Sequence, residues 1–188
     1  MFCSSGVLPD SSTEIDTKIK STAAHLYRLY SSKVPYEVYP DALQFLQNLD
    51  GRRKWFERRT VKVGIISNFD KRIVEIVDQL ELSPYLDFIV YSEECQSSKP
   101  EKAIFEAAIA KSGLKNLKCE EILHIGDDLR KDYQAAKNLG WNALLIQRNQ
   151  QAKKVVDSAA VKACTNELIT DDICDNFLGV ETKIFSTG

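Results

Sequence analysis

The chain has 188 residues, of which 44% are hydrophobic and 28% are charged, and its formal net charge is −2. This composition is typical of one globular domain with a buried core. The nearly balanced charge argues against a nucleic-acid partner, and no apolar run approaches the roughly 20 residues that cross a bilayer. The five cysteines are widely spaced, without a zinc-ligand pattern, which favours a reducing, intracellular compartment, with the cytoplasm as the expected location.

The N-terminal part of the chain predicts a frayed end followed by two helices. Residues 1–12 lack periodicity and are expected to be disordered. A helix is expected over 13–31, where apolar residues recur at spacings of three and four. Asp41 can cap a second helix, which is expected to end near Leu49. The basic run over 52–59 predicts a solvated loop, with nucleic-acid contact or nuclear import as the alternatives.

From residue 61 onward, short apolar runs alternate with helical patterns. Strands are expected at 61–67, 88–91, 122–125 and 143–146, and helices at 71–80, 100–110 and 131–139. This alternation is typical of βαβ units and indicates an α/β fold, with a parallel sheet flanked by helices. Gly140 is expected to form the left-handed cap of the third helix. Residues 147–188 are weakly periodic and predict a last helix and a tail.

Polar residues follow three of the predicted strands. Strand 61–67 ends in Ser67 and Asn68, strand 88–91 leads to Lys99, and strand 122–125 is followed by Gly126, Asp127 and Asp128. In an open parallel sheet, ligands bind outside the carboxyl ends of the strands. The three strand ends therefore predict that a hydroxyl, an ammonium and carboxylates meet at one edge.

These groups match the parts of a Mg²⁺-dependent phosphoryl-transfer site. Ser67, Asn68 and Lys99 are candidates for binding phosphoryl oxygens, and Mg²⁺ would be held by Asp127, Asp128 and Asp132. Each also has a plainer reading: turn and cap chemistry for the hydroxyl and amide, a solvated lysine before a proline that opens a helix, and acids that complement a helix dipole. The common order and placement of the three elements favour the functional reading. His124, inside an apolar run, is interpreted as a core histidine.

Three segments of the chain resemble the haloacid dehalogenase-like (HAD) hydrolase superfamily: Ile66 to Asp70, Lys99-Pro100, and His124 to Tyr133. The resemblance runs over about residues 22–178. It implies a Rossmann-like core and Mg²⁺-dependent hydrolysis of a phosphorylated small molecule through an aspartyl-phosphate. In that family Ser67 would contact the phosphoryl group, and Lys99 would stabilise the nucleophile and the transferring group. Asp127 would bind Mg²⁺, supported by Asp128 and Asp132.

The resemblance also implies an aspartate nucleophile that this sequence does not supply. The family opens with an apolar strand ending in Asp-x-Asp, which lies between the strands corresponding to 61–67 and 122–125. None of the aspartates before Ser67 closes an apolar strand; they are Asp10, Asp16, Asp41 and Asp50. Without that strand, a gap or a re-pairing of its two neighbours is expected.

The expected organisation follows from this comparison. Residues 13–40 would be a remnant of the helical cap, 41–150 the HAD-like core, and 151–188 a C-terminal helix and tail. The chain is expected to be a truncated form that is inactive alone, because a covalent mechanism needs its attacking carboxylate. The alternative is a non-catalytic isoform that binds Mg²⁺, phosphate or a protein partner.

Overall fold

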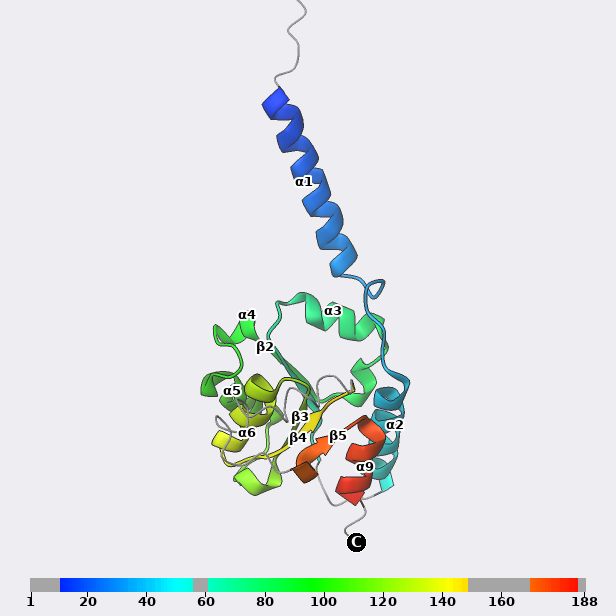
Figure 1. Cartoon of the computed structure of the whole chain (residues 1–188), viewed down its shortest axis with the longest axis vertical. Helices are drawn as coiled ribbons and strands as arrows, with labels where there is room; N and C mark the ends of the chain where they lie inside the picture. The colour runs from blue at the N-terminus through cyan, green and yellow to red at the C-terminus, as the bar shows by residue number, and fades with distance from the viewer. Residues whose placement is uncertain (1–10, 56–60, 149–169, 186–188) are drawn as a thin grey trace, which may run out of the picture. The chain divides into compact units, whose positions relative to one another are not determined.

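The structure is a computed structural model that describes residues 11–55, 61–148 and 170–185. The chain consists of two units, Met1–Glu37 and Val38–Gly188. The first contains helix α1 (Ser11–Tyr30), which confirms the helix predicted over 13–31 and begins two residues earlier (Figure 1). Most of the predicted disordered end lies outside the described residues. None of the described helices has the length and apolar character needed to cross a bilayer.

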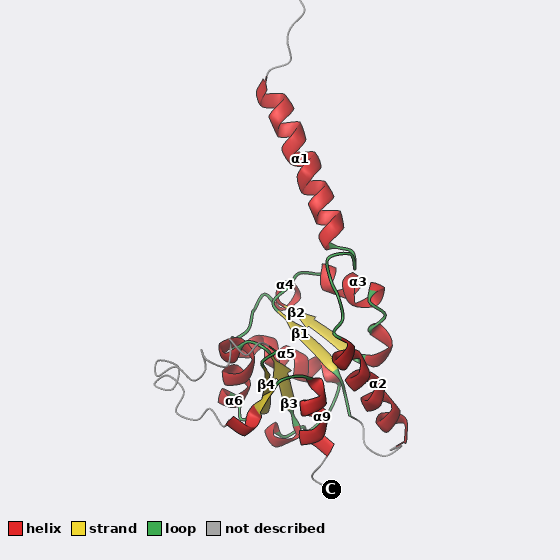
Figure 2. Cartoon of the chain, turned by 45° about the vertical axis from the view of Figure 1, so that its right-hand side comes forward, coloured by secondary structure: helices red, strands yellow, loops and turns green. Residues whose placement is uncertain are grey.

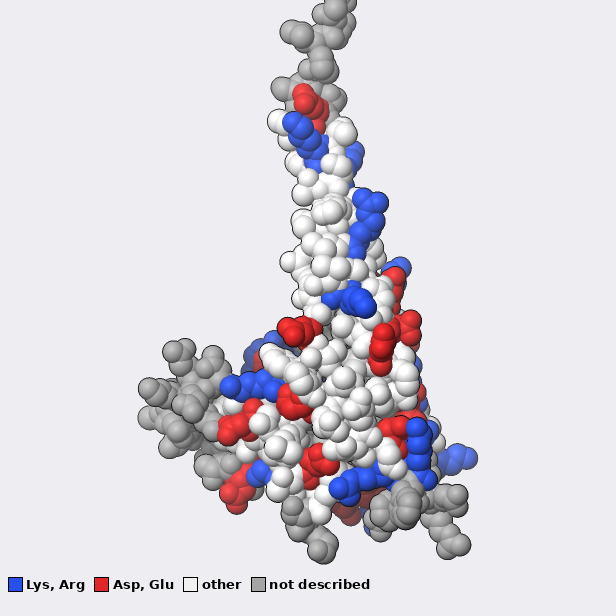
Figure 3. Space-filling view, turned by 90° about the vertical axis from the view of Figure 1, so that its right-hand side faces the viewer, with Lys and Arg blue, Asp and Glu red and all other residues white. Residues whose placement is uncertain are grey.

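Helix α2 (Pro40–Trp55) continues beyond its predicted end, so the loop predicted for the start of the basic run is wrong. Its last turn contains Arg52, Arg53 and Lys54, where positive charge complements the helix dipole. Each also meets an acidic residue: Arg53 donates to Asp87 over 2.7 Å, Lys54 pairs with Asp50, and Arg52 with Glu181. Basic and acidic side chains lie beside one another on the face of the molecule that Figure 3 shows. Arg58 and Arg59 lie outside the described residues.

Five strands in the described part of the second unit form two parallel sheets (Figure 2). They are β1 (Gly64–Ser67), β2 (Phe88–Tyr91), β3 (Leu123–Gly126), β4 (Asn142–Ile146) and β5 (Ile173–Cys174). One sheet pairs Ile66 of β1 with Val90 of β2, and the other places β4 between β3 and β5. The four predicted strands are confirmed. Strand β5 was not predicted, because two residues are too few to show an alternation.

The single parallel sheet expected from the sequence is divided, because β1 and β3 do not pair with each other. The carbonyl of Val63 accepts a hydrogen bond from the β2 side (2.7 Å), and that of Ile122 accepts one from the β4 side (3.0 Å). The backbone N–H and C=O groups of successive residues point to alternate sides of a strand. Those of Ile66 in β1 therefore point away from β2, and those of Ile125 in β3 point away from β4. Each sheet therefore ends at an edge without a partner strand among the described residues, and the two strands have not re-paired.

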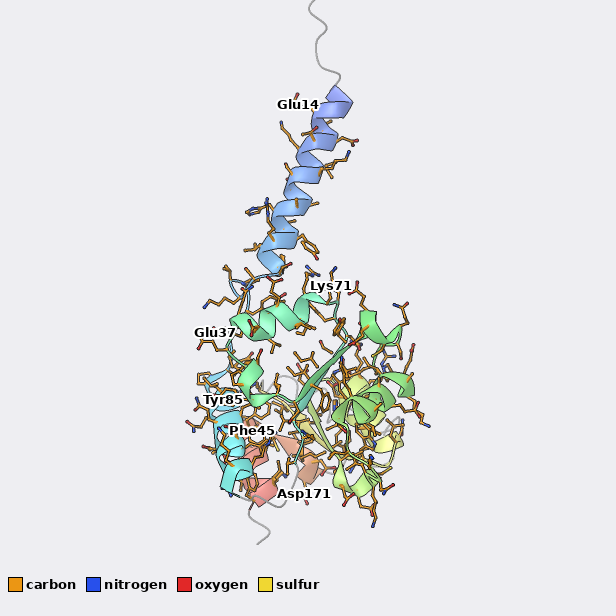
Figure 4. The ribbon with its side chains drawn as sticks, turned by 180° about the vertical axis from the view of Figure 1, so that it is seen from behind. Glu14, Glu37, Phe45, Lys71, Tyr85 and Asp171 are labelled. Carbon is orange, nitrogen blue, oxygen red and sulfur yellow. The ribbon has the colours of Figure 1, made fainter. Side chains whose placement is uncertain are left out.

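Helices lie on both faces of the sheet that contains β4 (Figure 1). Ala143 and Leu145 belong to a core cluster that includes residues of α5 and α6, while Leu144 and Ile146 belong to a second cluster with residues of α2 and α9. In the second cluster Phe45, labelled in Figure 4, lies 5.2 Å from Phe177 between ring centroids. This three-layer arrangement confirms the predicted α/β fold.

The remaining described elements complete the helical layers. They are α3 (Arg72–Gln79), η1 (Ser83–Tyr85), α4 (Ser92–Cys95), α5 (Lys102–Ser112), η2 (Cys119–Glu121), η3 (Leu129–Gln134), α6 (Ala135–Asn138), η4 (Thr170–Asp172) and α9 (Phe177–Phe185). The reading that Pro100 opens a helix at its first position is wrong: the Lys99–Pro100 bond is cis, and α5 begins at Lys102. Gly140 has φ +77°, which confirms its left-handed cap.

Candidate functional site

The loop that carries Lys99 is held onto the end of β1 by Asn68. The Asn68 side chain donates to the Lys99 carbonyl over 2.9 Å and accepts from the Lys99 backbone N–H over 2.6 Å. These two hydrogen bonds satisfy the backbone C=O and N–H groups of Lys99, which lies in a loop outside the regular strands and helices. It also uses most of the Asn68 amide, so the phosphate-binding role predicted for Asn68 stays a prediction.

Lys99 reaches from that loop to Asp132, which follows β3. The Lys99 Nζ lies 2.5 Å from Asp132 Oδ1, and both side chains are largely buried, with exposed fractions of 13% and 5%. His124 of β3 contacts the same oxygen at 3.1 Å through Nε2, and the Asp128 backbone N–H donates to Asp132 Oδ2 at 3.1 Å. Both carboxylate oxygens of Asp132 therefore have protein partners.

These contacts determine the charge state of Asp132. Burial by itself would raise the pKa of the Asp132 carboxyl, but the hydrogen bonds from His124 and Lys99, together with the Lys99 charge, outweigh burial and hold that pKa far below its usual range. Asp132 is consequently a carboxylate at neutral pH, paired with the Lys99 ammonium.

Gly126 and the wide first turn of η3 bring Asp132 into place. The N–H groups of Asp132 and Tyr133 both donate to the Asp128 carbonyl, over 2.9 and 3.2 Å, which is the pattern of a π-type turn. A Cβ on Gly126 would lie 2.3 Å from the Asp132 Cγ. The end of β3 must therefore be glycine for the Asp132 side chain to lie against it.

Asp128 caps η3. Its Oδ1 accepts from the backbone N–H groups of Arg130 (2.9 Å) and Lys131 (2.8 Å), and its other oxygen lies 3.4 Å from the Lys131 ammonium. Burial would raise the pKa of the Asp128 carboxyl, but these donors outweigh burial and lower it. The plainer reading, that an acid supports a helix N-terminus, therefore describes Asp128 well; its role toward Mg²⁺ stays a prediction.

Asp127 and Ser67 are the available groups at the strand ends. Within the described part of the chain, no hydrogen bond or ion pair engages the exposed Asp127 carboxylate or the half-buried Ser67 hydroxyl. The described residues contain no group of three or more His, Cys, Asp or Glu side chains that could enclose a metal ion. One carboxylate suits Mg²⁺ only where waters and phosphate oxygens complete its shell, which is a common way for proteins to hold this ion.

The described aspartates of the second unit that precede Ser67 have other partners. Asp41 lies 2.9 Å from the Arg148 guanidinium and accepts from the Phe177 backbone N–H at 2.8 Å, so it ties the start of α2 to the segment after β4 and to the start of α9. Asp50 pairs with Lys54 within α2, and Asp16 lies on α1. Asp10 lies outside the described residues.

The structure thus brings Lys99 together with Asp132, and it adds His124, which sequence reasoning had interpreted as a core histidine. The only sequence signal for this role is a titratable ring in an otherwise apolar strand, eight residues before an aspartate. That signal is weak, because a buried histidine most often satisfies its hydrogen bonds without a functional partner. The parallel strands, the helices on both faces and the polar groups at the carboxyl ends define a Rossmann-like α/β core with a candidate ligand site at its strand ends.

Comparison with known proteins agrees with this class. The family model for the haloacid dehalogenase-like hydrolases matches residues 8–140, and the chain belongs to this family. Its relatives include the Rhythmically expressed gene 2 protein of Drosophila melanogaster, 41% identical over 137 residues, which are 73% of this chain and 52% of that protein. Haloacid dehalogenase-like hydrolase domain-containing protein 3 of Danio rerio is 30% identical over 135 residues, 72% of this chain and 52% of that protein.

The fold has counterparts among solved structures. The HAD-hydrolase YfnB from Bacillus subtilis, solved bound to magnesium, superposes with a TM-score of 0.59 and 16% sequence identity, over 80% of this chain and 56% of that one. This likeness shows the shared fold. The chain spans about half the length of the curated relatives named above.

Proposed function

We propose that this chain is the core of a Mg²⁺-dependent phosphomonoester hydrolase and that, by itself, it does not turn over substrate. The observation that carries the proposal is the pairing of Lys99 with Asp132 at the strand ends that also carry Ser67 and Asp127. The described upstream aspartates of the second unit, Asp41 and Asp50, are paired with Arg148 and Lys54 instead. A largely buried ammonium and a strand-end hydroxyl both suit the oxygens of a phosphoryl group. An exposed carboxylate suits an ion held mainly by those oxygens and by water.

The missing component is the attacking group. Aspartyl-phosphate chemistry needs a carboxylate at the phosphorus atom, and Lys99, Ser67 and Mg²⁺ only bind and neutralise what that carboxylate attacks. Asp127 is the carboxylate we assign to Mg²⁺. Asp132 is already shared by Lys99, His124 and a backbone N–H. The proposed substrate class is a phosphorylated small molecule, which would react only where an attacking carboxylate completes the site.

The test is turnover by the purified full chain with p-nitrophenyl phosphate and Mg²⁺. We expect no release of p-nitrophenol above the buffer rate. Turnover that Asp127→Ala and Lys99→Gln each abolish would overturn the proposed inactivity, because it would show that this chain supplies its own nucleophile. Turnover that both variants retain would come from another enzyme in the preparation.

A non-catalytic binding role is the second candidate, favoured by the free Asp127 carboxylate. It predicts saturable heat of Mg²⁺ binding in isothermal titration, without turnover. Asp127→Ala should remove this heat. Asp128→Ala is the matched control, because Asp128 is occupied by the η3 cap, and it should retain the heat if Asp127 is the ligand. Heat that survives Asp127→Ala would exclude this site.

A further inference from the structure

A cluster of three side chains from three segments lies at the centre of the site. Lys99 comes from the loop before α5, His124 from β3 and Asp132 from η3. Asp132 Oδ1 accepts from Lys99 Nζ at 2.5 Å and lies 3.1 Å from His124 Nε2. The side chain of His124 is only 10% exposed. One carboxylate oxygen is therefore shared between a flexible ammonium and a ring carried by a strand.

The partner of the ring determines which nitrogen carries hydrogen. An ionised carboxylate only accepts hydrogen bonds, so the imidazole nitrogen that faces it must donate. His124 is consequently protonated at Nε2, and its ring donates to Asp132. This assignment follows from the chemistry of the partner, since hydrogen positions are otherwise ambiguous for histidine.

The His124 ring packs against an aromatic side chain of the hydrophobic core. Phe105 of α5, which is fully buried, meets His124 edge-on with ring centroids 5.4 Å apart and an interplanar angle of 77°. Phe105 meets Trp141 in the same way, at 5.4 Å and 85°. The backbone of His124 is paired with Ala143 of β4. The imidazole is thus a fixed donor, whereas the Lys99 side chain has four rotatable bonds.

We propose that His124 is a positioning residue: its Nε2–H holds the Asp132 carboxylate so that Asp132 in turn orients the Lys99 ammonium toward the carboxyl ends of the strands. An ammonium has three N–H donors, and Asp132 takes one of them. The direction of the other two depends on where Asp132 lies. His124 would then act on a bound phosphoryl group through Lys99. This last step rests on the proposed function, while the orientation of Lys99 does not.

Two substitutions separate this role from packing. His124→Leu keeps bulk against Phe105 and removes the donor, while His124→Gln places an amide N–H near the position of Nε2. In NMR spectra of the wild-type chain we expect the long-range ¹H–¹⁵N pattern of the Nε2–H form. We also expect an observable ammonium signal for Lys99, assigned by its loss in Lys99→Gln, since a held ammonium exchanges slowly with water. The signal should persist in His124→Gln and disappear in His124→Leu.

Affinity for inorganic phosphate gives the functional readout. We expect His124→Gln to bind phosphate within about twofold of the wild-type affinity and His124→Leu to bind it about tenfold more weakly. The N–H donor that glutamine keeps would then preserve the affinity, whereas the bulk that leucine keeps would not. A neutral ring protonated at Nδ1 in the wild type, or a Lys99 signal unchanged in a folded His124→Leu, would overturn the inference. If His124→Leu does not fold, the tautomer of His124 in the wild-type chain still tests the inference. If no form binds phosphate, the proposed function fails, and the Lys99 signal tests the inference separately.

Discussion

The Lys99 ammonium and the Asp132 carboxylate, 2.5 Å apart, connect two sheets that share no backbone hydrogen bonds. Lys99 is tied to the end of β1 through Asn68, and Asp132 lies against the end of β3 at Gly126. Side chains therefore join the carboxyl ends of β1 and β3, where a continuous sheet would have ladder hydrogen bonds. The contact that organises the candidate site is also one that holds the fold together.

Removing the carboxylate should destabilise the chain. We expect Asp132→Ala to lower the free energy of unfolding by about 3 kcal/mol, because breaking a buried ion pair leaves the other charge without compensation. Urea denaturation measures the change. Asp127→Ala is the matched control, since that side chain is exposed, and it should change stability by less than about 0.5 kcal/mol. Equal effects of the two substitutions would contradict the structural role of the Lys99–Asp132 pair.

The same pair should make stability depend on acid. The pKa of Asp132 is lowered in the folded chain, so its contribution is complete above the unfolded-state value of about 4 and is lost as pH falls from there toward the folded-state pKa. We expect Asp132→Asn to lose less stability than wild type when the pH is lowered from 5 to 2.5, measured as melting temperature. Parallel curves for the two proteins would show that Asp132 does not contribute to acid unfolding.

Two glycines should respond oppositely to alanine. Gly126→Ala places a Cβ against Asp132, and we expect it to cost about 1–3 kcal/mol through overpacking. Gly51 lies inside α2, and a Cβ added there would have no neighbouring atom within 4 Å, so Gly51→Ala should stabilise by about 0.5–1 kcal/mol through helix propensity. Chemical denaturation of both variants tests this. A neutral Gly126→Ala would mean that Asp132 does not lie against the strand end.

The edges of β1 and β3 that have no partner strand in the described part of the chain should be visible in amide exchange. Ile66 and Ile125 present their backbone groups away from the partner strands, so their N–H groups should exchange quickly with solvent. Leu144, on the strand that has a neighbour at each side, should exchange far more slowly. Hydrogen–deuterium exchange followed by NMR compares these residues. Protection of Ile66 and Ile125 equal to that of Leu144 would indicate that another segment covers the edges.

Several features could be predicted because they are local. The alternation of short apolar runs with helices indicated the α/β fold, since strand and helix periodicities are visible within windows of roughly 11–18 residues. Ser67, Lys99 and Asp127 were placed near strand ends for the same reason. The sequence predicts a loop for the basic run over 52–59, whereas α2 continues as far as Trp55, because a turn of charged residues facing acidic partners has no apolar signal.

By itself the sequence determined the layers of the fold, the order of its strands and helices, and which polar residues follow them, because these properties depend on the period of burial along the chain. Only the tertiary structure decided that Asp132 receives Lys99 and His124, that Asp128 caps a helix, and that β1 and β3 do not pair with each other. The three carboxylates of this segment look alike in the sequence. Whether each meets an ammonium, backbone N–H groups or solvent depends on segments distant along the chain, and that encounter sets its charge, its rigidity and its availability to a ligand.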